Sequence, residues 1–200
     1  MIFNFYFRIP KRIRFLILFI FIVFTTFFIL RFLILEPKNV PADFLKARQE
    51  ASLIAQEIVL FSNQSSDSLR QIAQLDEEKK YTEALILVSQ ELERNRQARE
   101  KAIRLSAQLE IMAKNLSQIS PASASQIALE AISSETALIS RLITHNDYLT
   151  QLLEILRNKF LGKANGDKIP ELIGQINNEV QAINDLDKKF NKMMKEFDLQ

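Results

Sequence analysis

The sequence predicts an all-α protein: a single N-terminal transmembrane helix followed by an elongated antiparallel bundle of three or four helices with coiled-coil-like packing. The 200 residues include three glycines and five prolines, too few for the many turns of a sheet protein. Beyond residue 42, apolar residues recur at alternating spacings of three and four, a pattern typical of long helices that pack side by side. Before residue 36, a long apolar run is almost free of charge.

This apolar run is long enough to cross a bilayer. Phe15–Leu30 contains no charged residue, and the whole run covers residues 13–35. The hydrocarbon core of a membrane is spanned by about 20 helical residues. A cleaved signal peptide is the alternative, but its apolar region is about 7–15 residues long and is followed by small residues at the cleavage site. Residues 36–39 offer no such site, so we expect an uncleaved anchor in the lipid bilayer.

Basic residues flank the predicted anchor unequally. They are Arg8, Lys11, Arg12 and Arg14 on the leading side and Arg31 near the trailing end. Arg14 and Arg31 lie near the ends of the run, where a guanidinium group can reach the lipid headgroups. Lysine and arginine concentrate on the cytoplasmic side of membrane helices. We therefore expect residues 1–12 to be a short cytoplasmic leader. The protein would then be a single-pass protein of the plasma (inner) membrane, with its C-terminal domain extracytoplasmic.

The charge of the chain excludes nucleic acid as a partner. The net charge is +2, but five of the 26 basic residues and none of the 24 acidic residues lie in the first 35 positions. The remaining 165 residues therefore carry a net charge of −3, without the basic stripe that a nucleic-acid surface requires. The absence of cysteine excludes disulfides, thiolate metal sites and cysteine nucleophiles.

The bundle begins after a short linker. Pro37 and Pro41 interrupt helical structure, so residues 36–42 read as a linker and residues 43–200 as the bundle. The first seam starts at Phe44 and passes through a polar stretch, residues 62–68. We expect one continuous helix through this stretch, with a turn near its middle as the alternative.

Three further helices follow. Asp76 and the two glutamates after it predict the start of the second helix, because a cap and negative charge suit a helix N-terminus. Ser120 and Pro121 predict the start of the third helix. The loop Gly162–Asp167 and the proline at 170 predict the fourth. Glu179 occupies one seam position of this helix, and we expect the neighbouring Val180 to cover for it.

Candidate chemistry is sparse. His145 is the only histidine, and Asp147, two residues later, points to a different face of a helix. Because His145 occupies a seam position, we expect a structural role for it. The candidate buried polar residues are Glu135, Arg141 and His145, and a polar cavity around any of them would favour a sensor. The Glu-x-x-His motif of di-metal helix bundles does not occur. We therefore expect no metal, no cofactor and no enzymatic activity.

The sequence favours an interaction protein. We expect a membrane-anchored helical bundle that acts as a scaffold, spacer or interaction subunit of a cell-envelope assembly, with a protein partner or a second copy bound through coiled-coil-like packing. Large apolar and adaptable side chains near the C-terminus form a candidate partner face, although they could simply close the bundle: Phe190, Met193, Met194 and Phe197. The alternative function is a four-helix ligand-sensing module that signals through a partner protein. In helix number and layout, though in no motif, the chain resembles the extracytoplasmic domains of bacterial chemoreceptors and sensor kinases.

Overall fold

The computed structural model describes residues 39–163 and 166–200, and Asn39–Gln200 form one compact unit. The predicted leader, the predicted anchor at 13–35 and the first part of the predicted linker lie outside the described residues. Among the described helices, none combines the length and apolarity needed to cross a membrane.

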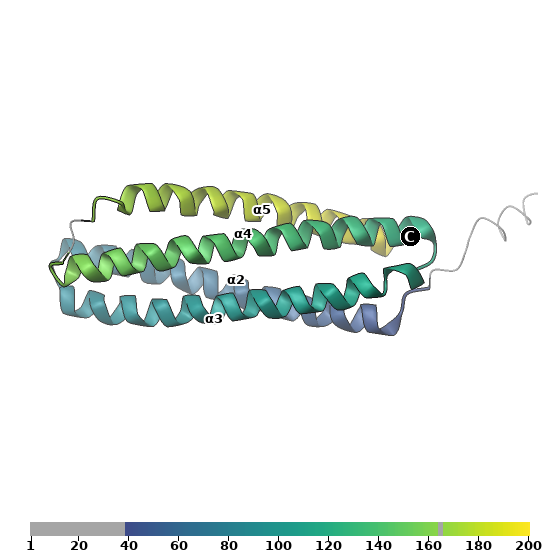
Figure 1. The fold of residues 1–200 in the computed structure, drawn as a ribbon, viewed down its shortest axis with the longest axis horizontal. Coiled ribbons are helices and arrows are strands. Elements are labelled where there is room, and N and C mark those ends of the chain that lie inside the picture. Colours follow the sequence, from purple (N-terminus) through teal and green to yellow (C-terminus); the bar gives the residue numbers. More distant parts are fainter. Residues whose placement is uncertain (1–38, 164–165) are drawn as a thin grey trace, which may run out of the picture. The chain divides into compact units, whose positions relative to one another are not determined.

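Four long helices make up this unit: α2 (Ala42–Glu77), α3 (Tyr81–Lys114), α4 (Ala122–Phe160) and α5 (Ile169–Leu199). A short 3₁₀ helix, Leu116–Gln118, follows α3. In Figure 1 the four helices lie side by side, and successive helices run in opposite directions. At a rise of 1.5 Å per residue they are roughly 45–60 Å long. The prediction of an all-α antiparallel bundle is confirmed.

The helix α2 is continuous through its polar stretch, as predicted. Ser65 and Ser68 are half-buried at seam positions, and Ile72 then returns the seam to the core with 1% of its surface exposed. The serines therefore mark a polar level of the bundle rather than a turn.

The junction between α2 and α3 differs from the prediction. Asp76 does not start a helix, since α2 ends at Glu77 and α3 begins at Tyr81. The chain reverses through Lys79, whose φ of 57° lies in the left-handed region, and the Lys80 N–H donates to the Leu75 carbonyl at 2.8 Å. The acidic residues are tolerated at a helix C-terminus because Lys159 donates to Asp76 at 2.5 Å and Lys80 to Glu78 at 2.7 Å.

The other two junctions lie where the sequence placed them. Pro121 precedes the first residue of α4 and is its N-cap residue, a position that the sequence assigned to Ser120. The Ser120 backbone exchanges two hydrogen bonds of 3.0 Å with the backbone of Asn39, which ties the beginning of α2 to the beginning of α4. Before α5, the chain turns through Gly162, with a φ of 70° that favours glycine.

The apolar core consists of two clusters. The first contains Phe44, Leu105, Met112 and Phe197, and it fills the end of the bundle at which α2 begins. The second contains Ile72 and Leu153 among others, and fills the end at which α2 meets α3. Each fully buried side chain of this size contributes about 1.5–3 kcal/mol to stability. Polar side chains occupy the level between the two clusters, and this level is where the candidate site lies.

Candidate functional site

A layer of polar side chains crosses the bundle between the two apolar clusters. We call it the polar layer. It consists of Ser68 on α2, Glu91, Arg94 and Asn95 on α3, His145, Asn146 and Thr150 on α4, and Glu179 on α5. The antiparallel helices with short connections bring these positions to similar heights, so that all four helices contribute.

Glu91 is the most deeply buried charged residue of the layer, with none of its surface exposed. The Arg94 guanidinium, one turn later on α3, donates to Glu91 Oε2 and, at 2.8 Å, to the Ser68 hydroxyl. Within the described chain, Glu91 Oε1 accepts no hydrogen bond. Removing one member of such a buried pair costs about 3–5 kcal/mol, because the other charge is left without compensation. The pair therefore ties α3 to the polar stretch of α2.

Asn95 makes the corresponding link from α3 to α4. Its Nδ2 donates to the Asn146 carbonyl and to Thr150 Oγ1, each at 2.8 Å. The Thr150 hydroxyl in turn donates to the same Asn146 carbonyl at 2.9 Å. Asn95 is 4% exposed and Asn146 is 7% exposed, so the amide donor of Asn95 meets its partners away from water. These bonds fix the relative register of α3 and α4.

Glu179 links α5 to α4 at the edge of the layer. The carboxylate is buried, and Arg141 Nη1 donates to its Oε1 at 3.2 Å. Arg141 was predicted to be buried, but 53% of its side chain is exposed, because the long arginine reaches Glu179 from the solvent side. Val180 does not cover for Glu179 in the seam, since it is 39% exposed.

His145 is half-buried beside this pair. Burial lowers its pKa, while the hydrogen bond with Asn146 and the negative charge of Glu179 act in the opposite direction. The imidazole therefore favours its neutral form in the folded protein.

Glu135 is buried as predicted, with 5% of its surface exposed. Burial and, to a smaller extent, the negative charge of Asp187 together raise the pKa of its carboxyl to about 7. Glu135 Oε2 has no hydrogen-bond partner among the described residues. Ten residues separate Glu135 from His145 on α4, which is about 15 Å along the helix. Glu135 and His145, two of the candidate buried polar residues, therefore lie at different levels of the bundle.

The predicted partner face lies in the core. Phe197 is 1% exposed and Met194 is 5% exposed, and both belong to the first apolar cluster. Phe190 and Met193 are partly buried against that cluster. These side chains close the bundle because α5 turns its apolar stripe towards the other helices, so they do not form an exposed surface.

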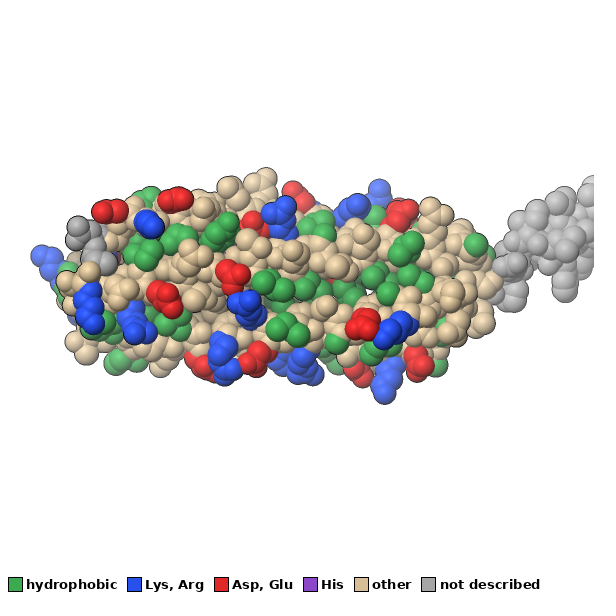
Figure 2. All heavy atoms as spheres, viewed as in Figure 1, with side chains coloured by type: hydrophobic (Ala, Val, Ile, Leu, Met, Phe, Trp, Pro, Cys, Tyr) green, Lys and Arg blue, Asp and Glu red, His purple; other side chains and the backbone are tan. Residues whose placement is uncertain are grey.

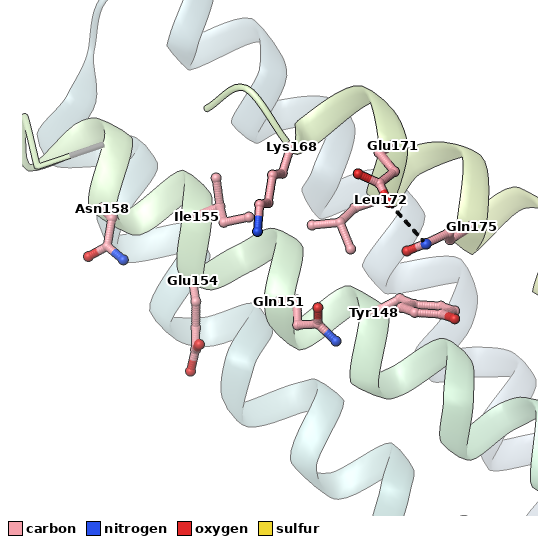
Figure 3. A pocket seen from close by; sticks show the side chains of 9 residues that line it. All are labelled: Tyr148, Gln151, Glu154, Ile155, Asn158, Lys168, Glu171, Leu172 and Gln175. Carbon is pink, nitrogen blue, oxygen red and sulfur yellow. Dashed lines mark hydrogen bonds between the residues drawn. The ribbon is translucent and has the colours of Figure 1, made fainter. Parts of the chain in front are cut away.

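A shallow groove of about 360 Å³ runs between α4 and α5 on the outside of the bundle (Figure 3). Ile155 and Leu172 give it an apolar floor, and Lys168 extends over it from the start of α5. Gln151 and Tyr148 line the α4 side. The groove thus offers one cation, the carboxylates of Glu154 and Glu171, and amide and hydroxyl groups, an arrangement that can hold a small polar molecule against an apolar base.

Sequence reasoning missed the buried polar residues of α3. Residues 91–101 are rich in charge, which by itself indicates a solvated portion of a long helix or one end of the bundle. A signal was present nevertheless: Ala84, Val88, Glu91, Asn95 and Ala102 continue a single three–four seam if polar residues are allowed to occupy it. The same rule does not find Asn146, because the seam on α4 runs through its neighbour His145. Only the structure shows that Asn146 is buried.

The described residues contain no group of three or more histidine, aspartate or glutamate side chains that could hold a metal ion. Comparisons of the chain with protein-family models, with curated proteins and with solved structures give no significant match.

Proposed function

We propose that this protein is a membrane-anchored, non-enzymatic spacer that holds an interaction surface at a fixed distance from an extracytoplasmic membrane face. The observation that carries this proposal is the polar layer, in which side chains of different helices bond to each other: Arg94 to Ser68, Asn95 to Thr150, and Arg141 to Glu179.

A layer of this kind favours one arrangement of the helices over its alternatives. Paired polar groups in a helical core specify register, because any slip leaves a buried donor or acceptor without its partner. A spacer needs such a fixed register, since its length and the orientation of its surfaces must not vary.

The dimensions of the bundle suit the same role. The 36 residues of α2 place the α2–α3 turn about 54 Å from Asn39 along the helix axis. The C-terminus lies at the same end of the bundle as the beginning of α4 (Figure 1). The opposite end, with the α2–α3 turn and the loop before α5, is then the part of the bundle farthest from residue 39.

The second candidate is a ligand-sensing module that signals through a partner protein. The groove of Figure 3 and the unpartnered oxygens of Glu91 and Glu135 favour it. A sensor needs an element with two arrangements that a ligand can bias. The hydrogen bonds of the polar layer hold a single arrangement, so we rank the spacer first.

Topology tests the proposal directly. A reporter fused after Gln200 that is active only outside the cytoplasm should be active in cells that produce the full chain. The protein should remain in the membrane fraction after alkaline extraction, whereas a variant lacking residues 2–35 should not. A cytoplasmic reporter signal, or release of the full chain by alkali, would contradict the proposed anchoring.

A further inference from the structure

One exposed face of α2 combines large apolar side chains with uncharged polar ones. Four large apolar side chains lie on it at about half exposure: Leu45 at 48%, Leu53 at 55%, Val59 at 60% and Leu60 at 54%. Three exposed amides, Gln49, Gln56 and Asn63, lie between them. At 100° per residue these seven residues fall opposite the buried stripe that begins at Phe44. We call them the outer α2 face.

No charged residue belongs to the outer α2 face. The charged residues of this stretch, Lys46, Arg48, Glu50 and Glu57, lie on its flanks. Two of them are paired within the bundle: Glu57 accepts a hydrogen bond from Lys101, and Arg48 donates to both carboxylate oxygens of Asp198 at 2.7 and 2.8 Å. Charge returns to the same side of the helix only at Asp67 and Arg70. The uncharged part is therefore the half of α2 that follows the N-terminal segment.

The exposed face of α3 shows what a solvated helix of this bundle looks like. Arg96 pairs with Glu93 and Glu100 on it, and Lys114 pairs with Glu110. In Figure 2, which looks onto α3, α4 and α5, basic and acidic side chains are spread along the whole length of the bundle. Against this background the outer α2 face is an unusual surface, because uncharged half-exposed apolar residues are typical of an interface.

We propose that the outer α2 face binds the same face of a second copy, with the two α2 helices parallel and in register. An uncharged face offers nothing to a strongly charged partner, whereas two copies of it meet without like-charge repulsion. Gln49, Gln56 and Asn63 are spaced by seven residues. In a parallel pair each amide meets its own copy, to which it can both donate and accept, and such polar pairs specify parallel register.

The parallel direction rests on the proposed function, because in two copies anchored in one membrane the chains lead into their bundles from the same side.

The size of the outer α2 face fits pairing between copies in one membrane. Between Leu45 and Asn63 it is about 27 Å long and about 10 Å wide, a footprint on the order of 300 Å². Stable interfaces between free proteins take about 800 Å² per partner. The pair is therefore weak between free molecules, and confinement to one membrane supplies the effective concentration that it needs.

Cysteine crosslinking of the full chain in membranes tests this pairing, because the protein has no cysteine of its own. Gln49→Cys, Gln56→Cys and Asn63→Cys, each as the single cysteine, should give covalent dimers with a short bismaleimide. Gln97→Cys on the exposed side of α3 is the matched control and should give at least tenfold less dimer. Adding Leu53→Glu and Leu60→Glu to the Gln56→Cys chain should lower its dimer yield about tenfold, since both side chains are exposed and the bundle does not need them.

Several outcomes would overturn the proposal. Equal yields at Gln97 and Gln56 would show random collision, and a yield unchanged by the two glutamates would show a different interface. Dimers between Gln49→Cys and Gln56→Cys chains, without dimers of either alone, would show antiparallel pairing. A polarity-sensitive dye at Gln56 that reports lipid, without crosslinks, would assign the face to the membrane. Membrane fractionation of the same variants keeps failure of the anchor separate from failure of the pairing.

Discussion

Of the three buried carboxyl groups among the described residues, those of Glu91 and Glu135 have very different surroundings. Glu91 holds the Arg94 guanidinium, whereas Glu135 lies in an apolar cluster with the negative Asp187 as its electrostatic neighbour. A buried charge is stable when it is paired and hydrogen-bonded, and otherwise the group tends to keep its proton. The two residues should therefore respond in opposite ways to removal of their charge.

Glu135→Gln should raise the free energy of unfolding at pH 8. It should also remove the pH dependence of stability that the Glu135 carboxyl contributes. The folded pKa of about 7 lies above the usual 4.5, so the folded state holds the proton more tightly. Stability is then greatest below pH 4.5 and falls as the pH rises to 7, by on the order of 3 kcal/mol. Urea unfolding of residues 39–200 at pH 5 and pH 8 measures this change. Glu130→Gln, on the exposed side of the same helix, is the control and should leave the difference unchanged.

His145 should produce the opposite slope. Its pKa is lowered by burial, so the unfolded state binds the proton more readily and stability falls as the pH drops below about 6.5. His145→Gln should therefore flatten the acid side of the stability profile without much effect at pH 8. A profile that keeps its acid limb in this variant would contradict the assignment of that limb to His145.

Arg94→Leu should destabilise the bundle by about 3–5 kcal/mol, because Glu91 would be left buried without its partner. The double variant Glu91→Gln with Arg94→Leu should regain a large part of this loss. Chemical denaturation of the two single variants and the double variant gives the coupling between the side chains. Additive effects would mean that the two residues act independently.

At the scale of the helices, the sequence predicted the structure correctly wherever apolar periodicity marks the extent of a helix. It predicted an antiparallel bundle of three or four helices, the continuous α2 and the loop before α5. It failed at Asp76, where one acidic cluster suits either a helix start or an ion-paired helix end, and only the contact with Lys159 decides between them. It also failed at Glu91 and Asn95, because a charged stretch reads as solvated until partners such as Ser68 and Thr150 are known.

The left-handed backbone at Lys79 gives a prediction at this scale. Lys79→Gly should stabilise the bundle by about 0.5–1 kcal/mol, because glycine adopts a φ of 57° without the steric cost that a side chain imposes. Lys80→Gly is the matched control. Its φ of −85° is ordinary for any residue, so the substitution adds unfolded-state freedom, removes the Lys80–Glu78 pair and should lower stability. Thermal unfolding of both variants distinguishes the two cases.

At the scale of the whole bundle, α5 is secured to α2 at the end where the chain terminates. Phe44 and Phe197 meet there with ring centroids 5.7 Å apart, and the Arg48–Asp198 pair lies beside them. Phe197→Ala should cost about 3–5 kcal/mol and should loosen the end of α5 first. Hydrogen exchange should show faster amide exchange in residues 190–199 than in the start of α5. Uniform loss of protection along α5 would contradict a localised attachment.

The backbone bridge between Asn39 and Ser120 has a mechanical consequence. A pulling force applied at residue 39 acts on more than the first turn of α2. The two 3.0 Å hydrogen bonds transfer part of this force to the connection between α3 and α4. Peeling α2 away from its end would require both bonds to rupture together, rather than one helical turn after another. The fold therefore places a mechanical clamp at the point where tension from the N-terminal segment enters the bundle.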